Sequence, residues 1–112
     1  MWRLGRHKYA IRGKHGVLSR RGRATGIVDW QARDIGAGGY VTIELKLIVE
    51  GARFECYPVV VSVEVTDECG RSLRIAECLL TQPTVRRDGF HQYRVLLADR
   101  SAEGAFDGFF RD

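Results

Sequence analysis

The chain has 112 residues, of which 45% are hydrophobic and 29% are charged, and its formal net charge is +4. This length and composition favour a single soluble globular domain built around one core. No segment approaches the roughly 20 apolar residues of a membrane-spanning helix, and the first residues lack the apolar stretch of about 7–15 residues that marks a secretory signal, so we expect a cytoplasmic protein without a membrane partner.

Basic and acidic residues are unevenly distributed along the chain. Residues 1–23 contain eight basic side chains and no acidic one, whereas the remainder contains ten basic and fourteen acidic side chains. Blocks of opposite charge either hold each other or recruit an anionic ligand such as nucleic acid. We therefore expect a basic arm over 1–23, docked on a β domain over 24–112. The cations of the arm are Arg3, Arg6, Lys8, Arg12, Lys14, Arg20, Arg21 and Arg23.

Short strands are expected at the beginning of the chain, around residues 9–11, 17–18 and 26–30, separated by glycines. Residues 40–50 give a much stronger signal, because apolar side chains occupy every second position from Val41 to Val49. Thr42, Glu44 and Lys46 occupy the opposite face. This period of two is typical of a half-buried strand.

Further strands and turns follow in regular order. After a turn at Glu50-Gly51, residues 54–65 alternate again, and we expect a bulge or a sheet edge at Pro58 because proline lacks the N–H that a sheet ladder requires. Residues 66–70 form a turn, and 72–80 pair back as the next strand. Asp88-Gly89 marks a second hairpin between 84–86 and 93–97.

The fold class that these elements predict is all-β, as an antiparallel sandwich or partly open barrel of about seven strands. Ser101 is a candidate cap for a short helical turn at the C-terminal end. That turn carries an aromatic cluster, for which we expect a role in core packing or in contacts between subunits. The cluster consists of Phe106, Phe109 and Phe110.

One short motif suggests a ligand. The run from Asp99 to Gly104, Asp-Arg-Ser-Ala-Glu-Gly, resembles the D-x-S-x-x-G element of PilZ domains, which are β-barrels that bind cyclic-di-GMP. Residues 34–39 echo it with glycine in place of serine, and an R-x-x-x-R pair is absent. A strand end that leads into a capped turn also produces this spacing, and we favour that interpretation.

Catalytic and metal-binding arrangements are not evident. The three cysteines, Cys56, Cys69 and Cys78, are an odd number without C-x-x-C spacing, which favours free thiols in a reducing compartment. His7, His15 and His91 lack the spacing of zinc ligands. We therefore expect a protein that is not an enzyme and has neither a metal site nor a cofactor.

Two functional hypotheses remain. The first is a binding or assembly module that forms a homo-oligomer through its basic arm. The second is a module that binds nucleic acid or another polyanion through the arm and through a basic hairpin at 86–94. Binding of nucleic acid requires both basic patches on one continuous face, whereas assembly requires the arm to lie on a neighbouring subunit. The cations of the hairpin are Arg86, Arg87 and Arg94.

Overall fold

The computed structural model describes residues 10–35, 42–51 and 54–98. These residues form strands and turns and no helix, and the expected C-terminal helical turn with its three phenylalanines lies outside the described residues. The strands are β1 (Ala10–Gly13), β2 (His15–Arg20), β3 (Arg23–Asp34), β4 (Thr42–Val49), β5 (Val59–Thr66), β6 (Ser72–Leu80), β7 (Thr84–Val85) and β8 (His91–Ala98).

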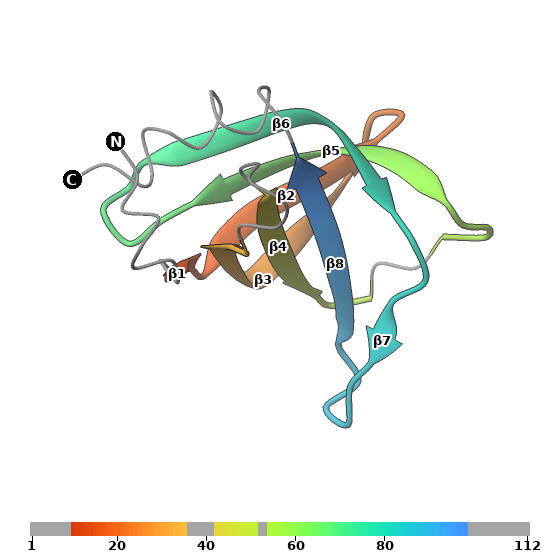
Figure 1. Ribbon diagram of the computed structural model, residues 1–112. Helices are drawn as coiled ribbons and strands as arrows, with labels where there is room; N and C mark the ends of the chain where they lie inside the picture. Colours follow the sequence, from red (N-terminus) through yellow and green to blue (C-terminus); the bar gives the residue numbers. More distant parts are fainter. Residues whose placement is uncertain (1–9, 36–41, 52–53, 99–112) are drawn as a thin grey trace.

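All strands belong to one antiparallel sheet in the order β6-β5-β2-β3-β4-β8-β7, with β1 paired to β3 beyond the end of β2. The sheet curls strongly, so that β5 and β6 arch over β3 and β4 (Figure 1). The curl brings β6 into contact with β8, although the two strands are not paired. The all-β prediction is therefore confirmed, and the architecture is the partly open barrel rather than the sandwich.

The described part of the basic arm belongs to this sheet. Residues 10–20 form β1 and β2, and β2 lies between β3 and β5. The boundary expected after Arg23 falls at the hairpin between β2 and β3. That hairpin has two central residues with positive φ, Arg21 at 50° and Gly22 at 79°, which is the geometry of the type I′ turn that suits the twist of antiparallel strands.

The core lies on the concave side of the curled sheet. In β4, the apolar residues at alternate positions are fully buried, as the period of two predicted. β5 repeats this pattern from Val59 to Val65. The strand begins at Val59, so the phase change expected at Pro58 is the start of the strand rather than a bulge within it.

The β5–β6 register shifts between Val61 and Val63, and a bulge occurs in β3. The register with β4 shifts between Ile27 and Asp29, which leaves Val28 as an extra residue. The shift allows Ile27 and Trp30 to point into the core although they are three positions apart. From Trp30 onward the strand alternates regularly, so Gln31 and Arg33 lie on the convex side.

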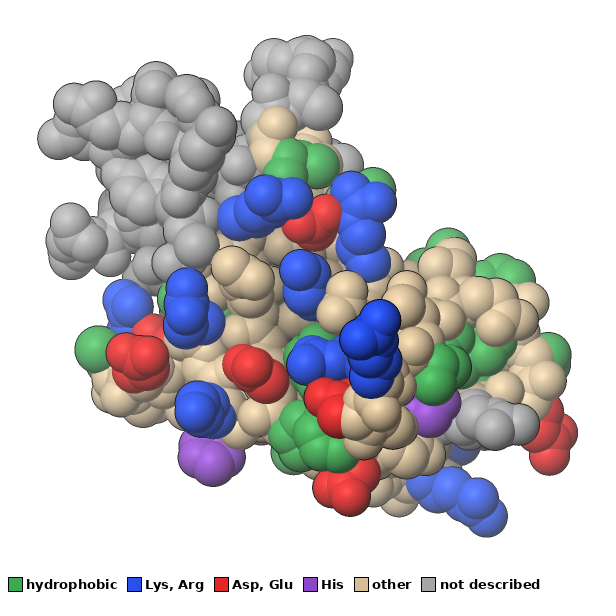
Figure 2. Space-filling view, turned by 90° about the horizontal axis from the view of Figure 1, so that it is seen from below, with side chains coloured by type: hydrophobic (Ala, Val, Ile, Leu, Met, Phe, Trp, Pro, Cys, Tyr) green, Lys and Arg blue, Asp and Glu red, His purple; other side chains and the backbone are tan. Residues whose placement is uncertain are grey.

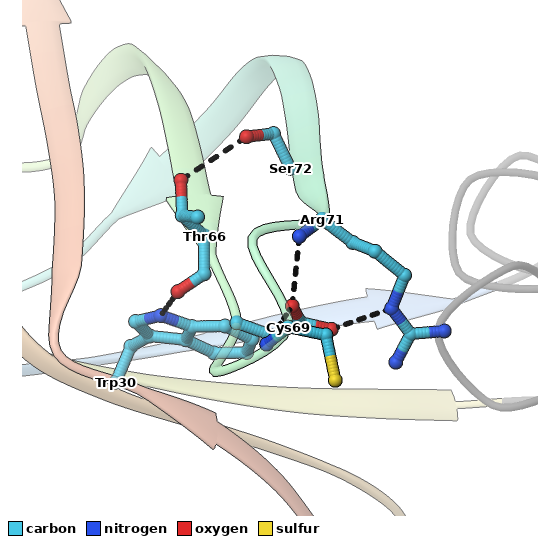
Figure 3. Close-up of polar contacts among 6 residues, drawn as sticks. Trp30, Thr66, Cys69, Arg71 and Ser72 are labelled. Carbon is cyan, nitrogen blue, oxygen red and sulfur yellow. Dashed lines mark hydrogen bonds and ion pairs between the residues drawn. The ribbon is translucent and has the colours of Figure 1, made fainter.

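Trp30 connects two distant parts of the sheet. Its ring is 1% exposed, and its indole N–H donates a hydrogen bond to the carbonyl oxygen of Thr66 at 3.0 Å, at the end of β5 (Figure 3). Gly13 lies against both groups. A Cβ atom at this position would lie 2.1 Å from the Thr66 oxygen and 2.5 Å from the indole nitrogen. The close approach of the three strands therefore requires glycine at position 13.

Replacement of Gly13 by alanine is expected to lower the free energy of unfolding by about 1–3 kcal/mol, because a rigid backbone oxygen and the buried indole occupy the space of the new methyl group. Gly26→Ala is the matched control, since a Cβ atom there meets nothing within 4 Å and the residue does not have positive φ. Denaturant unfolding measures both variants. Equal stability of the two would contradict the packing account.

The turn between β5 and β6 is organised by one buried carboxylate. Asp67 Oδ1 accepts hydrogen bonds from the backbone N–H groups of Cys69 at 2.9 Å and Arg71 at 2.8 Å, and Oδ2 accepts one from Arg71 Nε at 2.7 Å (Figure 3). Burial by itself raises the pKa of Asp67. The hydrogen bonds from Arg71 and Cys69 and the charge of Arg71 outweigh burial, so the pKa lies below its usual value.

Asp67→Asn is expected to cost about 1.5–3 kcal/mol of stability at neutral pH, because the hydrogen bonds to a charged acceptor are weakened. A carboxyl group with a depressed folded-state pKa stabilises the fold above its unfolded pKa, and this contribution is lost as the pH falls through the folded value. The difference in stability between the wild type and the variant should therefore shrink as the pH falls from 5 to about 2. Chemical denaturation across this range tests the prediction, and a constant difference would refute it.

Candidate functional site

A row of polar side chains crosses the convex side of the sheet. Arg12 of β1 lies opposite Gln31 of β3, Gln31 lies opposite Lys46 of β4, and Lys46 lies opposite Arg94 of β8. Residues directly opposite one another on antiparallel strands share a face of the sheet. The row therefore joins a cation of the predicted arm to a cation of the predicted hairpin through Lys46.

The neighbouring row contains a buried carboxylate. Glu44 of β4 lies opposite Arg33 of β3, and Arg94 lies diagonally across from it on β8. Glu44 Oε1 accepts a hydrogen bond from Arg33 Nε at 2.7 Å, and Oε2 accepts one from Arg94 Nε. The carboxylate side chain is only 7% exposed, whereas those of the two arginines are 54% and 59% exposed. The acid is covered and the two cations face solvent.

The two arginines keep this carboxylate ionised. Burial raises the pKa of Glu44, but the hydrogen bonds from Arg33 and Arg94, together with their positive charges, outweigh that effect and lower the pKa below its usual value. At neutral pH the three side chains therefore carry one net positive charge. With Arg12 and Lys46 beside them, this part of the face is strongly cationic.

Two hollows follow these rows. The larger has a volume of about 440 Å³ and extends from β1 across β3 and β4 toward the hairpin of β7 and β8. The smaller has a volume of about 200 Å³ and lies over β3 and β4. Figure 2 shows lysine and arginine side chains spread over this side of the molecule, with acidic side chains between them. The larger hollow is lined by the cations Arg12, Lys14, Lys46 and Arg86 and by the acids Asp29 and Glu68, and the smaller by Gln31, Arg33, Glu44 and Lys46.

The structure brings some of the predicted site residues together and separates others. Arg12, Lys14, Arg86 and Arg94 share the convex face of β1, β3, β4 and β8. Arg87 is exposed in the turn between β7 and β8. The remaining described cations of the arm, Arg20, Arg21 and Arg23, lie at the β2–β3 hairpin, where Arg20 and Arg21 border β5 rather than the row, and Arg3, Arg6 and Lys8 lie outside the described residues.

The sequence did not single out Arg33, Glu44 and Lys46, which belong to this face. The alternation in 40–50 does indicate that Glu44 and Lys46 point away from the core. Their importance depends on strand pairing, since only the register of β3, β4 and β8 shows that Arg33 and Arg94 flank Glu44. No local motif carries that information.

Other chemistries find little support in the described part of the chain. No group of three or more His, Cys, Asp or Glu side chains there is arranged to hold a metal ion. Cys56 and Cys69 are exposed free thiols, and burial raises the pKa of Cys78 to about 12, which makes it a poor nucleophile at neutral pH. The segment that resembles the PilZ element, 99–104, lies outside the described residues.

Comparisons with known proteins give no identification. No family model matches the chain, and no curated protein or solved structure is significantly similar to it. Within residues 10–35, 42–51 and 54–98, no helix has the length and hydrophobicity needed to cross a membrane. The evidence for function therefore comes from the side chains of the convex face.

Proposed function

We propose that this protein is a non-catalytic binding module for polyanions, with nucleic acid as its ligand, and that the convex face of β1, β3, β4 and β8 is the binding surface. The observation that carries the proposal is the row Arg12-Gln31-Lys46-Arg94. It unites two basic segments that are some 80 residues apart in the sequence on one continuous surface. Such continuity is the feature that distinguishes nucleic-acid binding from assembly through the arm.

The dimensions of the face suit a nucleic-acid backbone. Neighbouring strands lie about 4.8 Å apart, so a row across β1, β3, β4 and β8 spans about 14 Å. A row of this length can contact more than one phosphate of a nucleic-acid backbone. The cations on or beside the row outnumber the acids. They are Arg12, Lys14, Arg33, Lys46, Arg86 and Arg94, against Asp29, Glu44 and Glu68.

The expected mode of recognition is contact with phosphates rather than with bases. Among the residues that the structure describes, every tryptophan, tyrosine and phenylalanine side chain is buried or half-buried, so this face offers no exposed ring for base stacking. Contacts from Arg and Lys to phosphate position a protein on nucleic acid without reading its sequence. We therefore expect little sequence preference and a strong dependence on salt. A cytoplasmic location completes the proposal and agrees with three unpaired thiols.

Self-association is a second candidate, favoured by a different observation. Val60 of β5 and Leu79 of β6 lie opposite each other on the convex side, and they are 52% and 55% exposed. Among the described strands, β6 ends the order of the sheet, so its outer edge offers backbone groups for pairing with a second copy. Assembly through the arm has less support, because residues 10–20 already pair within their own sheet.

For the proposed binding function, we expect the Arg12→Ala/Lys46→Ala double variant to bind a 20-nucleotide single-stranded DNA with lower affinity, and the slope of log affinity against log salt to decrease by about 2. The matched control is Arg23→Ala/Arg74→Ala, which removes two exposed arginines outside the face. Fluorescence anisotropy from 20 to 300 mM salt supplies both affinities and slopes. Failure of the wild type to bind at low salt, or equal losses in the two variants, would contradict the proposal.

For self-association, we expect the wild type to sediment as an oligomer and Val60→Lys to shift it toward the monomer, because a charge would be buried in the contact. Val17→Lys is a control, since Val17 is an exposed valine of β2 in a different row. Sedimentation velocity over a range of protein concentrations measures the effect. A wild type that is monomeric throughout would exclude this candidate.

A further inference from the structure

We propose that Arg33, Glu44 and Arg94 form a phosphate clamp within the convex face. In this clamp the two guanidinium groups contact one backbone phosphate, and Glu44 is the positioning residue that holds them in place. The inference rests on the proposed nucleic-acid function and deepens it, because it names the group that is recognised and the residues that recognise it.

The geometry of the ion pairs supports this assignment. Glu44 divides its two oxygens between the Nε atoms of Arg33 and Arg94, one for each arginine. Within the described part of the chain, both guanidinium groups donate to Glu44 through their Nε atoms. Each Nη atom carries two N–H donors. Because both side chains are more than half exposed, these donors can reach an external acceptor.

The carboxylate fixes both cations before a ligand arrives. A free arginine on a protein surface loses much rotamer freedom when it binds, and this loss reduces affinity. Here the two arginines lose that freedom when the protein folds, because they are bonded to Glu44. Glu44 is almost fully covered, and its lowered pKa keeps it charged at neutral pH. Two oriented guanidinium groups remain, with Lys46 next to them in the adjoining hollow.

A phosphate group, which has several oxygens that accept hydrogen bonds, suits this pair of guanidinium groups. The planar donors of guanidinium match phosphate oxygens in pairs, which gives Arg a geometric advantage over Lys at such sites. The hollow of about 200 Å³ lined by Gln31, Arg33, Glu44 and Lys46 leaves room beside the clamp. A neighbouring phosphate of the same strand then lies toward Lys46 and Arg12 along the row.

The Glu44→Gln variant distinguishes binding by the clamp from binding by net charge alone. The substitution removes a negative charge and makes the face more positive, so attraction by net charge alone predicts tighter binding of DNA. The clamp predicts the opposite, a loss of about 5-fold or more, because both arginines lose their fixed orientation. Anisotropy with the 20-nucleotide DNA at one salt concentration measures the change, and thermal unfolding verifies that the variant is folded. Tighter or equal binding would overturn the clamp.

Charge-conserving variants of the two arginines give a second test, which remains valid if Glu44→Gln does not fold. Arg33→Lys and Arg94→Lys retain the positive charge but remove the guanidinium donors, so each should weaken binding several-fold. Arg74→Lys is the matched control, because Arg74 is an exposed arginine that lies outside the face. Equal affinities in all three variants would also overturn the clamp while leaving the proposed function intact. Absence of binding by the wild type would overturn both.

A competition experiment identifies the source of the phosphate. The clamp on a nucleic-acid backbone predicts that a DNA in which the central phosphates are replaced by neutral methylphosphonates binds the wild type more weakly, while inorganic phosphate at the same concentration as the DNA does not compete. If inorganic phosphate instead displaces the DNA from the wild type but not from Glu44→Gln, the clamp is a site for free phosphate and the backbone assignment is wrong.

Discussion

The contact between Trp30 and Thr66 determines how the sheet is arranged. The indole N–H donates across the interior from β3 to the last carbonyl of β5, and Gly13 leaves the space that this approach requires. Burial of Trp30 also fixes the phase of β3 after its bulge. Because side chains alternate along a strand, Gln31 and Arg33 must then face outward. A core interaction thus determines which side chains reach the convex face.

Glu44 has the corresponding role on the outside of the sheet. A carboxylate that is nearly covered would be costly without partners, and Arg33 and Arg94 supply one hydrogen bond to each oxygen. The same contacts orient the two arginines and leave their outer donors exposed. The stability of the ion pairs and the proposed recognition of phosphate therefore depend on one arrangement. The alternative, a solvated surface without fixed geometry, would leave Glu44 exposed.

The sequence was sufficient for much of the fold. Strong alternation predicted β4 and most of β5, while Ser72–Leu80 and the Asp88-Gly89 turn matched β6 and the β7–β8 hairpin. The sequence could not reveal that β2 pairs with β5, since that pairing joins segments more than 40 residues apart. Nor could it reveal the Glu44 contacts, which depend on register. Charge distribution indicated Arg12 and Arg94 separately, and only the pairing of four strands unites them.

The central claim is that an anionic backbone lies over Arg33, Glu44 and Arg94. Arginine Nε–H groups give resolved signals in two-dimensional nitrogen–proton NMR spectra, so titration of the labelled protein with single-stranded DNA at low salt examines the claim directly. We expect the Nε–H signals of Arg33 and Arg94 to shift together with backbone amides of β3, β4 and β8, while those of β5 and β6 stay in place. Shifts confined to β5 and β6, or none at all, would contradict the account.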